Sequence, residues 1–259
     1  MPRFFVQASS IEDGVVRLFG SDASHISRSL RMRPGEEIVV CDMQRREYRC
    51  VLERFTADEV YARVISESAS ETEPPYRITV YQALAKSDKM DYIVQKSVEA
   101  GAFAVVPFEG ERCVARELSD NGTERAGKRL ERRNRIALEA AKQCGRGIVP
   151  SVSEPVSFDA MLDMASRSAV RLFFYEGDGT VSLREYLTRE FSAPGETRGV
   201  LPEGSEISVV IGAEGGFSSG EVDMAREKGF ALCGLGKRIL RCETASAFAL
   251  ACLAFWFEI

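Results

Sequence analysis

The chain has 259 residues, of which 45% are hydrophobic and 28% charged, a composition ordinary for a folded protein and a length sufficient for two modest domains. No apolar run approaches the roughly eighteen residues of a membrane-spanning helix, and we find no secretory signal, so we expect a cytoplasmic protein. The formal net charge of −5 argues against a simple nucleic-acid binder with a basic surface.

The metal-binding residue types are sparse. Seven cysteines are scattered singly without a C-x-x-C pair, and His25 is the only histidine in the chain. This pattern predicts reduced thiols and no metal site. We favour a structural or RNA-contacting role for His25 over a catalytic one, because it is far in sequence from the glycine loops described below.

Residues 1–72 have the pattern of a small β-barrel domain. Short apolar or β-branched runs alternate with turns, which predicts strands at Phe4–Val6, Val15–Phe19, Glu37–Cys41, Glu47–Leu52 and Glu59–Ile65. One helical insertion is expected at Ser21–Met32, and it carries Arg28 and Arg31. The polar, proline-ended stretch Ser66–Pro75 is the best interdomain linker in the chain.

From residue 73 onward, strand and helix patterns alternate, which predicts an α/β domain with a largely parallel sheet. The expected strands are Arg77–Leu84, Ala102–Phe108 and Val170–Tyr175, and the expected helices are Ser87–Ala100 and Thr123–Cys144. Residues 179–205, which include the turn Ala193–Glu196, are interpreted as a surface connection. The last helix, Thr244–Glu258, is apolar on nearly every side and must be covered by its own core or by another subunit.

Two glycine loops near the carboxyl terminus predict a ligand site. Ile207–Ile211 is typical of a buried strand that opens into a glycine loop, after which Ser218 and Glu221 have the spacing of a capping box. A second apolar run, Phe230–Leu235, leads into Gly236 and a basic turn. Strand ends of this kind meet at one edge of an α/β sheet, where ligands bind. Each loop alone could be an ordinary tight turn, and neither matches the dinucleotide or P-loop fingerprints.

Basic residues concentrate in the segment from Arg112 to Arg146, which holds ten lysines and arginines against five acids. Several recur at three-to-four spacing along the expected helix, namely Arg125, Lys128, Arg129, Arg132 and either Arg135 or Arg133. A solvated face with intrahelical ion pairs is the plainer interpretation. The alternative is a phosphate contact surface, which we adopt because of the family resemblance described below.

Five blocks of the sequence carry a family resemblance. They are Met1–Val6, Lys86–Asp91 with Gln95–Lys96, Arg135–Arg146, Ile211-Gly-Ala-Glu-Gly-Gly-Phe-Ser218 and Leu235-Gly-Lys-Arg-Ile-Leu-Arg-Cys-Glu-Thr-Ala245. In this order they resemble the ribosomal small subunit methyltransferase E family of the SPOUT superfamily, across nearly the whole chain. Ala213 and Cys242 stand where that family usually has proline and threonine. Neither departure removes a charged or glycine position.

The resemblance implies a PUA-like RNA-binding β-barrel at residues 1–72 and a SPOUT methyltransferase domain at 73–259 with a carboxyl-terminal trefoil knot. It also implies a homodimer, S-adenosylmethionine as cofactor, and methylation of N3 of a uridine in 16S ribosomal RNA, within the small subunit. Composition and spacing alone would instead predict an unknotted doubly wound sheet.

On that basis we assign residues to three roles. The expected catalytic residues are Arg241 and Arg238, which stabilise the anion formed at the uridine, and Glu243 as proton acceptor. The cofactor would be held by Tyr175, Glu176, Gly177, Ile211, Gly212, Glu214, Gly215, Gly216, Leu235, Gly236, Ile239 and Leu240. The RNA would be held by Arg3, Arg28, Arg31, Arg112, Arg129 and Arg132.

Two other classes of function stay open at the level of sequence. One is a non-enzymatic RNA-binding or ribosome assembly factor, in which the glycine loops are structural and the basic helix does the binding. The other is a nucleotide-binding enzyme of ordinary doubly wound topology, which the missing fingerprints disfavour.

Overall fold

The computed structural model describes residues 1–192 and 199–259. These residues form two compact units. Unit 1 comprises Met1–Glu73 and Ala141–Val149, and unit 2 comprises Pro74–Ala140 and Pro150–Ile259. The chain therefore passes from one unit to the other three times, and the segment 141–149 returns to unit 1 from within the second half of the sequence.

Unit 1 is built on a six-stranded sheet with the order β1-β4-β5-β6-β3-β2. β1 pairs in parallel with β4, and the other neighbours are antiparallel. The strands are β1 Arg3–Phe5, β2 Ile11–Glu12, β3 Val15–Phe19, β4 Glu37–Cys41, β5 Arg46–Phe55 and β6 Glu59–Ala69, with short helices η1 Ala8–Ser10, α1 Gly20–Ser24 and η2 His25–Ser29. Alternate strand residues point inward, and Phe4, Leu18, Ile38 and Leu52 form the core.

The five strands predicted for this unit are confirmed, whereas the single helix expected at Ser21–Met32 is not. The segment forms α1 followed by a π-helical turn, η2, and it ends before Arg31, whose φ of +53° is incompatible with a continuing helix. His25 lies edge-on to the Phe4 ring, with 6.3 Å between ring centroids. This contact places the histidine in unit 1.

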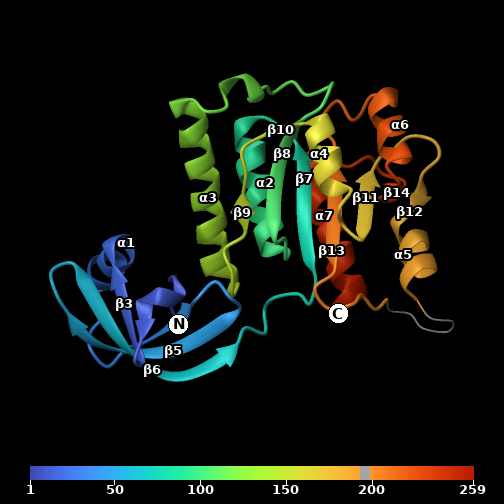
Figure 1. Ribbon diagram of the computed structural model, residues 1–259. Helices are drawn as coiled ribbons and strands as arrows, with labels where there is room; N and C mark the ends of the chain where they lie inside the picture. The colour runs from blue at the N-terminus through green and yellow to red at the C-terminus, as the bar shows by residue number, and fades with distance from the viewer. Residues whose placement is uncertain (193–198) are drawn as a thin grey trace. The chain divides into compact units, whose positions relative to one another are not determined.

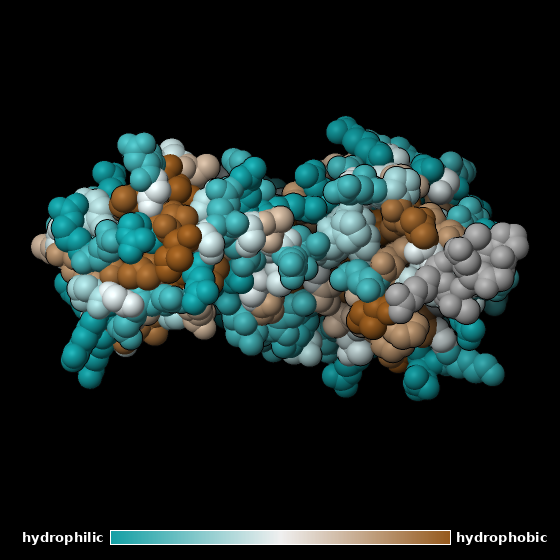
Figure 2. Space-filling view, turned by 90° about the horizontal axis from the view of Figure 1, so that it is seen from below, coloured by the Kyte–Doolittle hydropathy of each residue, from teal (hydrophilic) through white to brown (hydrophobic). Residues whose placement is uncertain are grey.

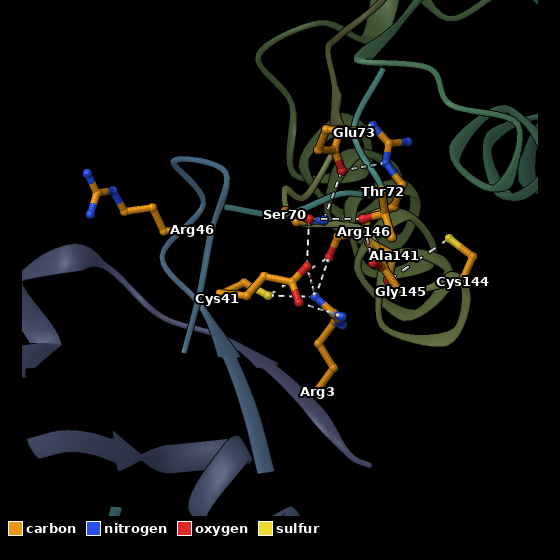
Figure 3. A network of polar contacts seen from close by, with 12 residues as sticks. Arg3, Cys41, Arg46, Ser70, Thr72, Glu73, Ala141, Cys144, Gly145 and Arg146 are labelled. Carbon is orange, nitrogen blue, oxygen red and sulfur yellow. Dashed lines mark hydrogen bonds and ion pairs between the residues drawn. The ribbon is translucent and has the colours of Figure 1, made fainter. Parts of the chain in front are cut away.

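The predicted linker Ser66–Pro75 is not a free polar tether. Its first residues extend β6 as far as Ala69, and the Glu73 carboxylate accepts hydrogen bonds from the Arg146 guanidinium at 2.8 and 2.7 Å (Figure 3). The Arg146 and Glu73 side chains are only 4% and 2% exposed. The boundary between the two units falls within the predicted linker, after Glu73. The segment is not solvated throughout, because the Glu73 carboxylate is buried and paired.

Further contacts tie the same segment to residues 145–147. The Thr72 hydroxyl donates to the Gly145 carbonyl at 2.8 Å, and the Gly147 N–H donates to Glu73 at 2.8 Å (Figure 3). Arg3 donates both to the Arg146 carbonyl at 3.3 Å and to the Glu47 carboxylate at 3.1 Å. Every partner belongs to unit 1, so this network holds residues 70–73 and 145–147 together within it.

Unit 2 contains the predicted parallel sheet. Its order is β10-β8-β7-β13-β11-β14-β12, with β9 also paired to β8, and all pairings are parallel (Figure 1). The strands are β7 Arg77–Ala83, β8 Ala104–Glu109, β9 Ser151–Val152, β10 Val156–Ser157, β11 Val170–Phe174, β12 Val181–Ser182, β13 Glu206–Ile211 and β14 Ala231–Gly234. The helices are α2 Ser87–Glu99, η3 Leu118–Asp120, α3 Glu124–Cys144, α4 Phe158–Ala165, α5 Leu183–Phe191, α6 Ser219–Glu227 and α7 Cys242–Phe257.

Helices cover both faces of this sheet (Figure 1). On one face, α2 and α7 pack together, and Met90, Ile93 and Cys242 share a buried cluster. On the other face, α4 and α6 pack over a larger cluster that includes Phe173 and Phe217. The strands are buried on both sides, which agrees with their nearly continuous apolar sequences.

The surface connection expected at residues 179–205 contains regular structure. β12 pairs with β14, and α5 follows it at once, with the Ser182 hydroxyl accepting from the Glu185 N–H at 3.1 Å. The sequence held this capping signal, a serine three residues before a glutamate, and the prediction overlooked it. The turn predicted at Ala193–Glu196 lies outside the described residues.

Helix α7 is apolar on nearly all sides, as predicted, and unit 2 covers only part of it. Leu250 and Leu253 are buried against α2 and β13, whereas Phe255 is 67% exposed and Phe248 is 39% exposed. Figure 2 shows, on one face of the molecule, patches of apolar side chains among mostly polar ones. In the described part of the chain, no helix is long and apolar enough to cross a membrane.

Candidate functional site

A cleft of about 860 Å³ lies in unit 2, at the carboxyl ends of three adjacent strands. Loops that follow β11, β13 and β14 form its walls, at Tyr175–Gly177, Gly212–Phe217 and Leu235–Arg241. Parallel neighbours bring all their carboxyl ends to one edge, so loops from distant parts of the sequence meet there. The cleft has the size and the mixed apolar and polar lining of a small-molecule site.

The loop after β13 leaves little space for a Cβ at two of its glycines. A Cβ on Gly212 would lie 3.0 Å from the Phe217 ring, and a Cβ on Gly215 would lie 3.0 Å from the Arg112 carbonyl oxygen. Phe217 is anchored against Phe173, with 4.1 Å between ring centroids. The chain therefore folds tightly over an aromatic anchor, and its backbone faces the cleft.

The predicted capping box at the start of α6 is present and has a second role. The Ser218 hydroxyl accepts a hydrogen bond from the Glu221 N–H at 3.3 Å, and the Glu221 carboxylate accepts one from the Ser218 N–H at 2.9 Å. The buried Glu221 carboxylate also accepts from the Glu111 N–H at 2.7 Å. One carboxylate thus fixes both the start of α6 and the loop after β8, which carries Arg112 to the cleft.

A cluster of charges from three elements lies at the cleft. The Lys89 ammonium, on α2, is 2.8 Å from a Glu214 carboxylate oxygen in the β13 loop and 3.7 Å from a Glu243 carboxylate oxygen at the start of α7. Glu243 also accepts from the Cys242 thiol at 3.2 Å. Two carboxylates thus share one ammonium group, and all three side chains retain some exposure, between 17% and 32%.

The contacts explain the ionisation of this cluster. The hydrogen bond from Lys89 holds the pKa of Glu214 below its ordinary value and raises the pKa of Lys89 itself. Burial tends to raise the pKa of Glu243, but its own backbone N–H, the Cys242 thiol and Lys89 outweigh burial, and the pKa is lowered. Burial also raises the pKa of Cys242 to about 12, so this thiol stays protonated near neutral pH.

All twelve residues predicted to bind the cofactor line this one cleft, from Tyr175 in the first loop to Leu240 in the third. Arg238 and Arg241, two of the three predicted catalytic residues, also line it, and both are exposed. Glu243 lies beside the cleft, and its carboxylate is occupied by Lys89 and Cys242.

The predicted RNA-binding arginines fall into three places. Arg112 lines the cleft, and its guanidinium donates to the Gly215 carbonyl at 3.4 Å. Arg129 and Arg132 line a shallow groove on α3 together with Glu124, Arg125 and Lys128. Its cations are paired with carboxylates: Lys128 with Glu124, Arg129 with Glu117 and Asp120, and Arg132 with Asp91. Arg28, Arg31 and Arg3 belong to unit 1, where the first two are exposed and Arg3 joins the network around Glu73.

Two of the ten basic residues between Arg112 and Arg146 do not belong to an exposed basic surface. Arg133 is buried and forms a bidentate ion pair with the Glu117 carboxylate, with N···O distances of 2.9 and 2.8 Å. Arg146 is buried in its ion pair with Glu73. Of the alternatives for the last member of the stripe, Arg135 is exposed and Arg133 is not. The count of ten basic residues in this segment therefore overstates the number of positive charges on its surface.

Lys89 is a charged residue of the cleft to which the sequence analysis assigned no role. It lies in the Lys86–Asp91 block, which contributed to the family resemblance but received no role. No local pattern connects it with Glu214, which is 125 positions away. Only the packing of α2 beside the carboxyl end of the sheet brings the two side chains together.

Two family models match the chain. The model of an RNA methyltransferase domain matches residues 72–254, and that of an RNA methyltransferase PUA domain matches residues 20–65. A ribosomal RNA small subunit methyltransferase E of Bacillus subtilis (strain 168) is 33% identical over the full length of this chain and 98% of its own. This chain belongs to that methyltransferase E family.

Solved structures of similar proteins agree with this membership. A ribosomal RNA small subunit methyltransferase E from Neisseria gonorrhoeae, crystallised with S-adenosylmethionine, is 30% identical, covers 99% of this chain and 98% of its own, and superposes with a TM-score of 0.77. A methyltransferase from Legionella pneumophila, in complex with the same cofactor, is 26% identical, with coverage of 98% and 96% and a TM-score of 0.80. The methyltransferase E family thus shares both units of this fold.

Proposed function

We propose that this protein transfers the methyl group of S-adenosylmethionine to N3 of a uridine in 16S ribosomal RNA, within the small ribosomal subunit. The observation that carries the proposal is the meeting of three glycine loops and two exposed arginine side chains, Arg238 and Arg241, at one cleft of a methyltransferase domain. In this proposal, residues 1–72 form the RNA-binding domain and residues 73–259 form the methyltransferase domain.

The residues of the cleft fit this methyl donor. Backbone N–H and carbonyl groups of the loops at Tyr175–Gly177, Gly212–Gly216 and Leu235–Leu240 are available to its polar groups, and Ile211, Leu235, Ile239 and Leu240 supply apolar surface for adenine. A Cβ at Gly212 or Gly215 would lie 3.0 Å from a neighbouring atom, so the tight turns accept a larger residue only if that neighbour moves by a few tenths of an ångström. When bound, the donor supplies a methyl group on a sulfonium, which is already a good leaving group.

Because the methyl group is so activated, the chain contributes chiefly by orienting the base. Uridine N3 loses a proton as it takes up the methyl group, and negative charge spreads onto O2 and O4. Arg241 and Arg238, exposed at the cleft, are placed to donate hydrogen bonds to those oxygens. An arginine suits this role because it remains charged at every physiological pH.

Glu243 is the proposed proton acceptor, acting through a water molecule that it orients. Its lowered pKa keeps the carboxylate ionised near neutral pH, as an acceptor requires. Its ion pair with Lys89 and its hydrogen bond from Cys242 fix the orientation of the carboxylate beside the cleft.

The RNA would be held by arginines of both units. Arg112 lies at the cleft itself, where the target base must leave its stack to be reached. The groove on α3, lined by Arg125, Lys128, Arg129 and Arg132, suits a phosphate backbone. In unit 1, the exposed Arg28 and Arg31 are available to RNA, whereas Arg3 contributes by holding its own domain together.

We also propose the trefoil knot and the homodimer of SPOUT enzymes for this chain. After β14, the chain returns across the sheet so that α7 packs against α2 and β13, a path that supports a threaded carboxyl end. The exposed Phe248 and Phe255 of α7 would be covered by a second copy. Light scattering of the purified protein tests this, since a monomer at micromolar concentration contradicts the dimer.

A calorimetric titration separates the enzyme from an RNA-binding assembly factor. The proposed enzyme binds one S-adenosylmethionine per chain in the absence of RNA. An assembly factor with structural glycine loops would bind RNA and give no heat with the methyl donor. A nucleotide-binding enzyme of another class would bind NAD in its place.

A further inference from the structure

We propose that Lys89 is a positioning residue that joins Glu214 to Glu243 and thereby holds the β13 loop against the start of α7 in the geometry that accepts the methyl donor. This inference rests on the proposed function, because it concerns the same cleft. It assigns a role to a side chain on α2, an element that contributes no glycine loop to the site.

The argument begins with the arrangement of charge. Glu214 comes from the loop after β13, and Glu243 comes from the first turn of α7, so nothing in the local sequence fixes the distance between them. Both carboxylates face one ammonium group, at 2.8 and 3.7 Å. Without that ammonium, two like charges would face each other at a partly desolvated position, which is unfavourable.

The surroundings show that no other cation substitutes for Lys89 at Glu214. In the described part of the chain, the charged or titratable groups that act on Lys89, Glu214 and Glu243 are the Cys242 thiol and Arg241. Arg112, whose guanidinium donates to the Gly215 carbonyl, lines the same cleft, as do Glu176, Lys237 and Arg238. The thiol is protonated near neutral pH, and the Arg241 charge acts on Glu243. Among the described side chains, only Lys89 donates a hydrogen bond to the Glu214 carboxylate, which also accepts from its own backbone N–H.

The geometry also explains why the contact bears on ligand binding. Glu214 lies between Ala213 and Gly215, in the loop that wraps over the Phe217 anchor. The Gly216 N–H donates to the Ala213 carbonyl at 3.0 Å, so the loop is a tight turn with Glu214 and Gly215 at its tip. A displacement of the Glu214 carboxylate therefore displaces the loop backbone that lines the cleft. The ion pair with Lys89, on a helix packed against the sheet, limits that displacement.

The test compares three single variants by calorimetric titration with S-adenosylmethionine and with its demethylated product, S-adenosylhomocysteine. Lys89→Met removes the charge and keeps the length of the side chain. Lys89→Arg keeps the charge. Lys96→Met is the matched control, because Lys96 lies on the same helix and pairs with Glu99 at 2.7 Å, with no contact to the cleft.

We expect Lys89→Met to weaken the binding of both ligands by about tenfold, because the loop is displaced for either one. Lys89→Arg and Lys96→Met should stay within about threefold of the unaltered protein. A preserved affinity in Lys89→Met overturns the proposal, as does an equal loss in Lys96→Met. If the unaltered protein binds neither ligand, the proposed function has failed, and that result is separate from any effect of Lys89.

Two further measurements identify repulsion between the carboxylates as the cause. In Lys89→Met, Glu214 and Glu243 face each other, so the pKa of at least one rises and its protonation as the pH falls toward 5 should restore part of the lost affinity. In the unaltered protein, Glu214 is ionised at pH 5 because its pKa is lowered, and affinity should hold between pH 8 and pH 5.

The double variant Lys89→Met with Glu243→Gln removes the repulsion at every pH, and we expect its affinity to return to within about threefold of the unaltered protein. Circular dichroism of each variant verifies folding. A loss in Lys89→Met that neither acid nor Glu243→Gln relieves shows that the side chain acts by packing alone, and it overturns the proposal.

Discussion

The Glu73–Arg146 network of unit 1 and the Lys89 cluster of unit 2 both pair carboxylates with cations, but they differ in burial and in charge balance. In unit 1, the Glu73 and Arg146 side chains are almost completely buried, and both Glu73 oxygens accept hydrogen bonds from the Arg146 guanidinium or the Gly147 N–H. In unit 2, Lys89 faces two carboxylates at a cleft, and all three side chains keep contact with solvent. The first cluster is closed and balanced, whereas the second carries an excess negative charge.

The difference follows from the location of each cluster. A buried pair is tolerated only when its hydrogen bonds are complete, and breaking it leaves an unpaired charge in the interior. A partly exposed, unbalanced cluster costs less to rearrange and can respond to a ligand. We therefore assign the Glu73 network to stability and the Lys89 cluster to binding.

The largest expected effect concerns the closed network. Glu73→Ala leaves the Arg146 guanidinium buried without its carboxylate and should lower the free energy of unfolding by about 3–5 kcal/mol. Urea unfolding followed by circular dichroism measures the change. The matched control is Glu71→Ala, an exposed carboxylate two positions away, for which we expect less than about 0.5 kcal/mol. Equal midpoints for the two variants would contradict the assignment to stability.

The next effect concerns catalysis at the open cleft. Arg241→Ala removes a donor placed to stabilise the uridine anion and should lower kcat by about 10²–10³-fold, while the affinity for the methyl donor stays within about threefold. Single-turnover methyl transfer and titration measure the two quantities separately. The control is Arg184→Ala, an exposed arginine on α5 outside the cleft. Equal losses of turnover and of donor affinity would contradict the catalytic role of Arg241.

The smallest effect concerns the groove on α3. Lys128→Ala should weaken binding to small-subunit RNA a few-fold and reduce the slope of log K against log salt concentration by about 1, because one phosphate contact is lost. Arg189→Ala, on α5, removes a charge of similar exposure and should leave the slope unchanged. An unchanged slope in Lys128→Ala would exclude this residue from the RNA interface.

The position of the cleft could be predicted from the sequence, because parallel strands order their carboxyl ends by themselves. The glycine loop after Ile211 and the basic turn after Leu235 each follow a buried strand, and the sheet then brings them together. The capping box at Ser218 and Glu221 was equally local, and it is present as predicted. The resemblance to known methyltransferases supplied the chemistry, which the spacing alone left open.

What could not be predicted depends on pairing between distant residues. Lys89 and Glu214 meet only because α2 packs beside the end of β13, and Glu73 is buried only because Arg146 returns to unit 1. Composition made Ser66–Pro75 resemble a solvated linker and made Arg133 resemble part of a basic face. The sequence alone does not show that Glu73 pairs with Arg146 or that Arg133 pairs with Glu117, because both pairs form only in the folded chain.

The central claim is tested most directly by methyl transfer in a purified system. Small subunits from cells lacking the modification are incubated with the protein and isotopically labelled S-adenosylmethionine, and nucleosides of the 16S RNA are then analysed by mass spectrometry. We predict one labelled N3-methyluridine per subunit. Label at another atom or nucleotide, or donor binding without any transfer to the subunit or its RNA, would contradict the account.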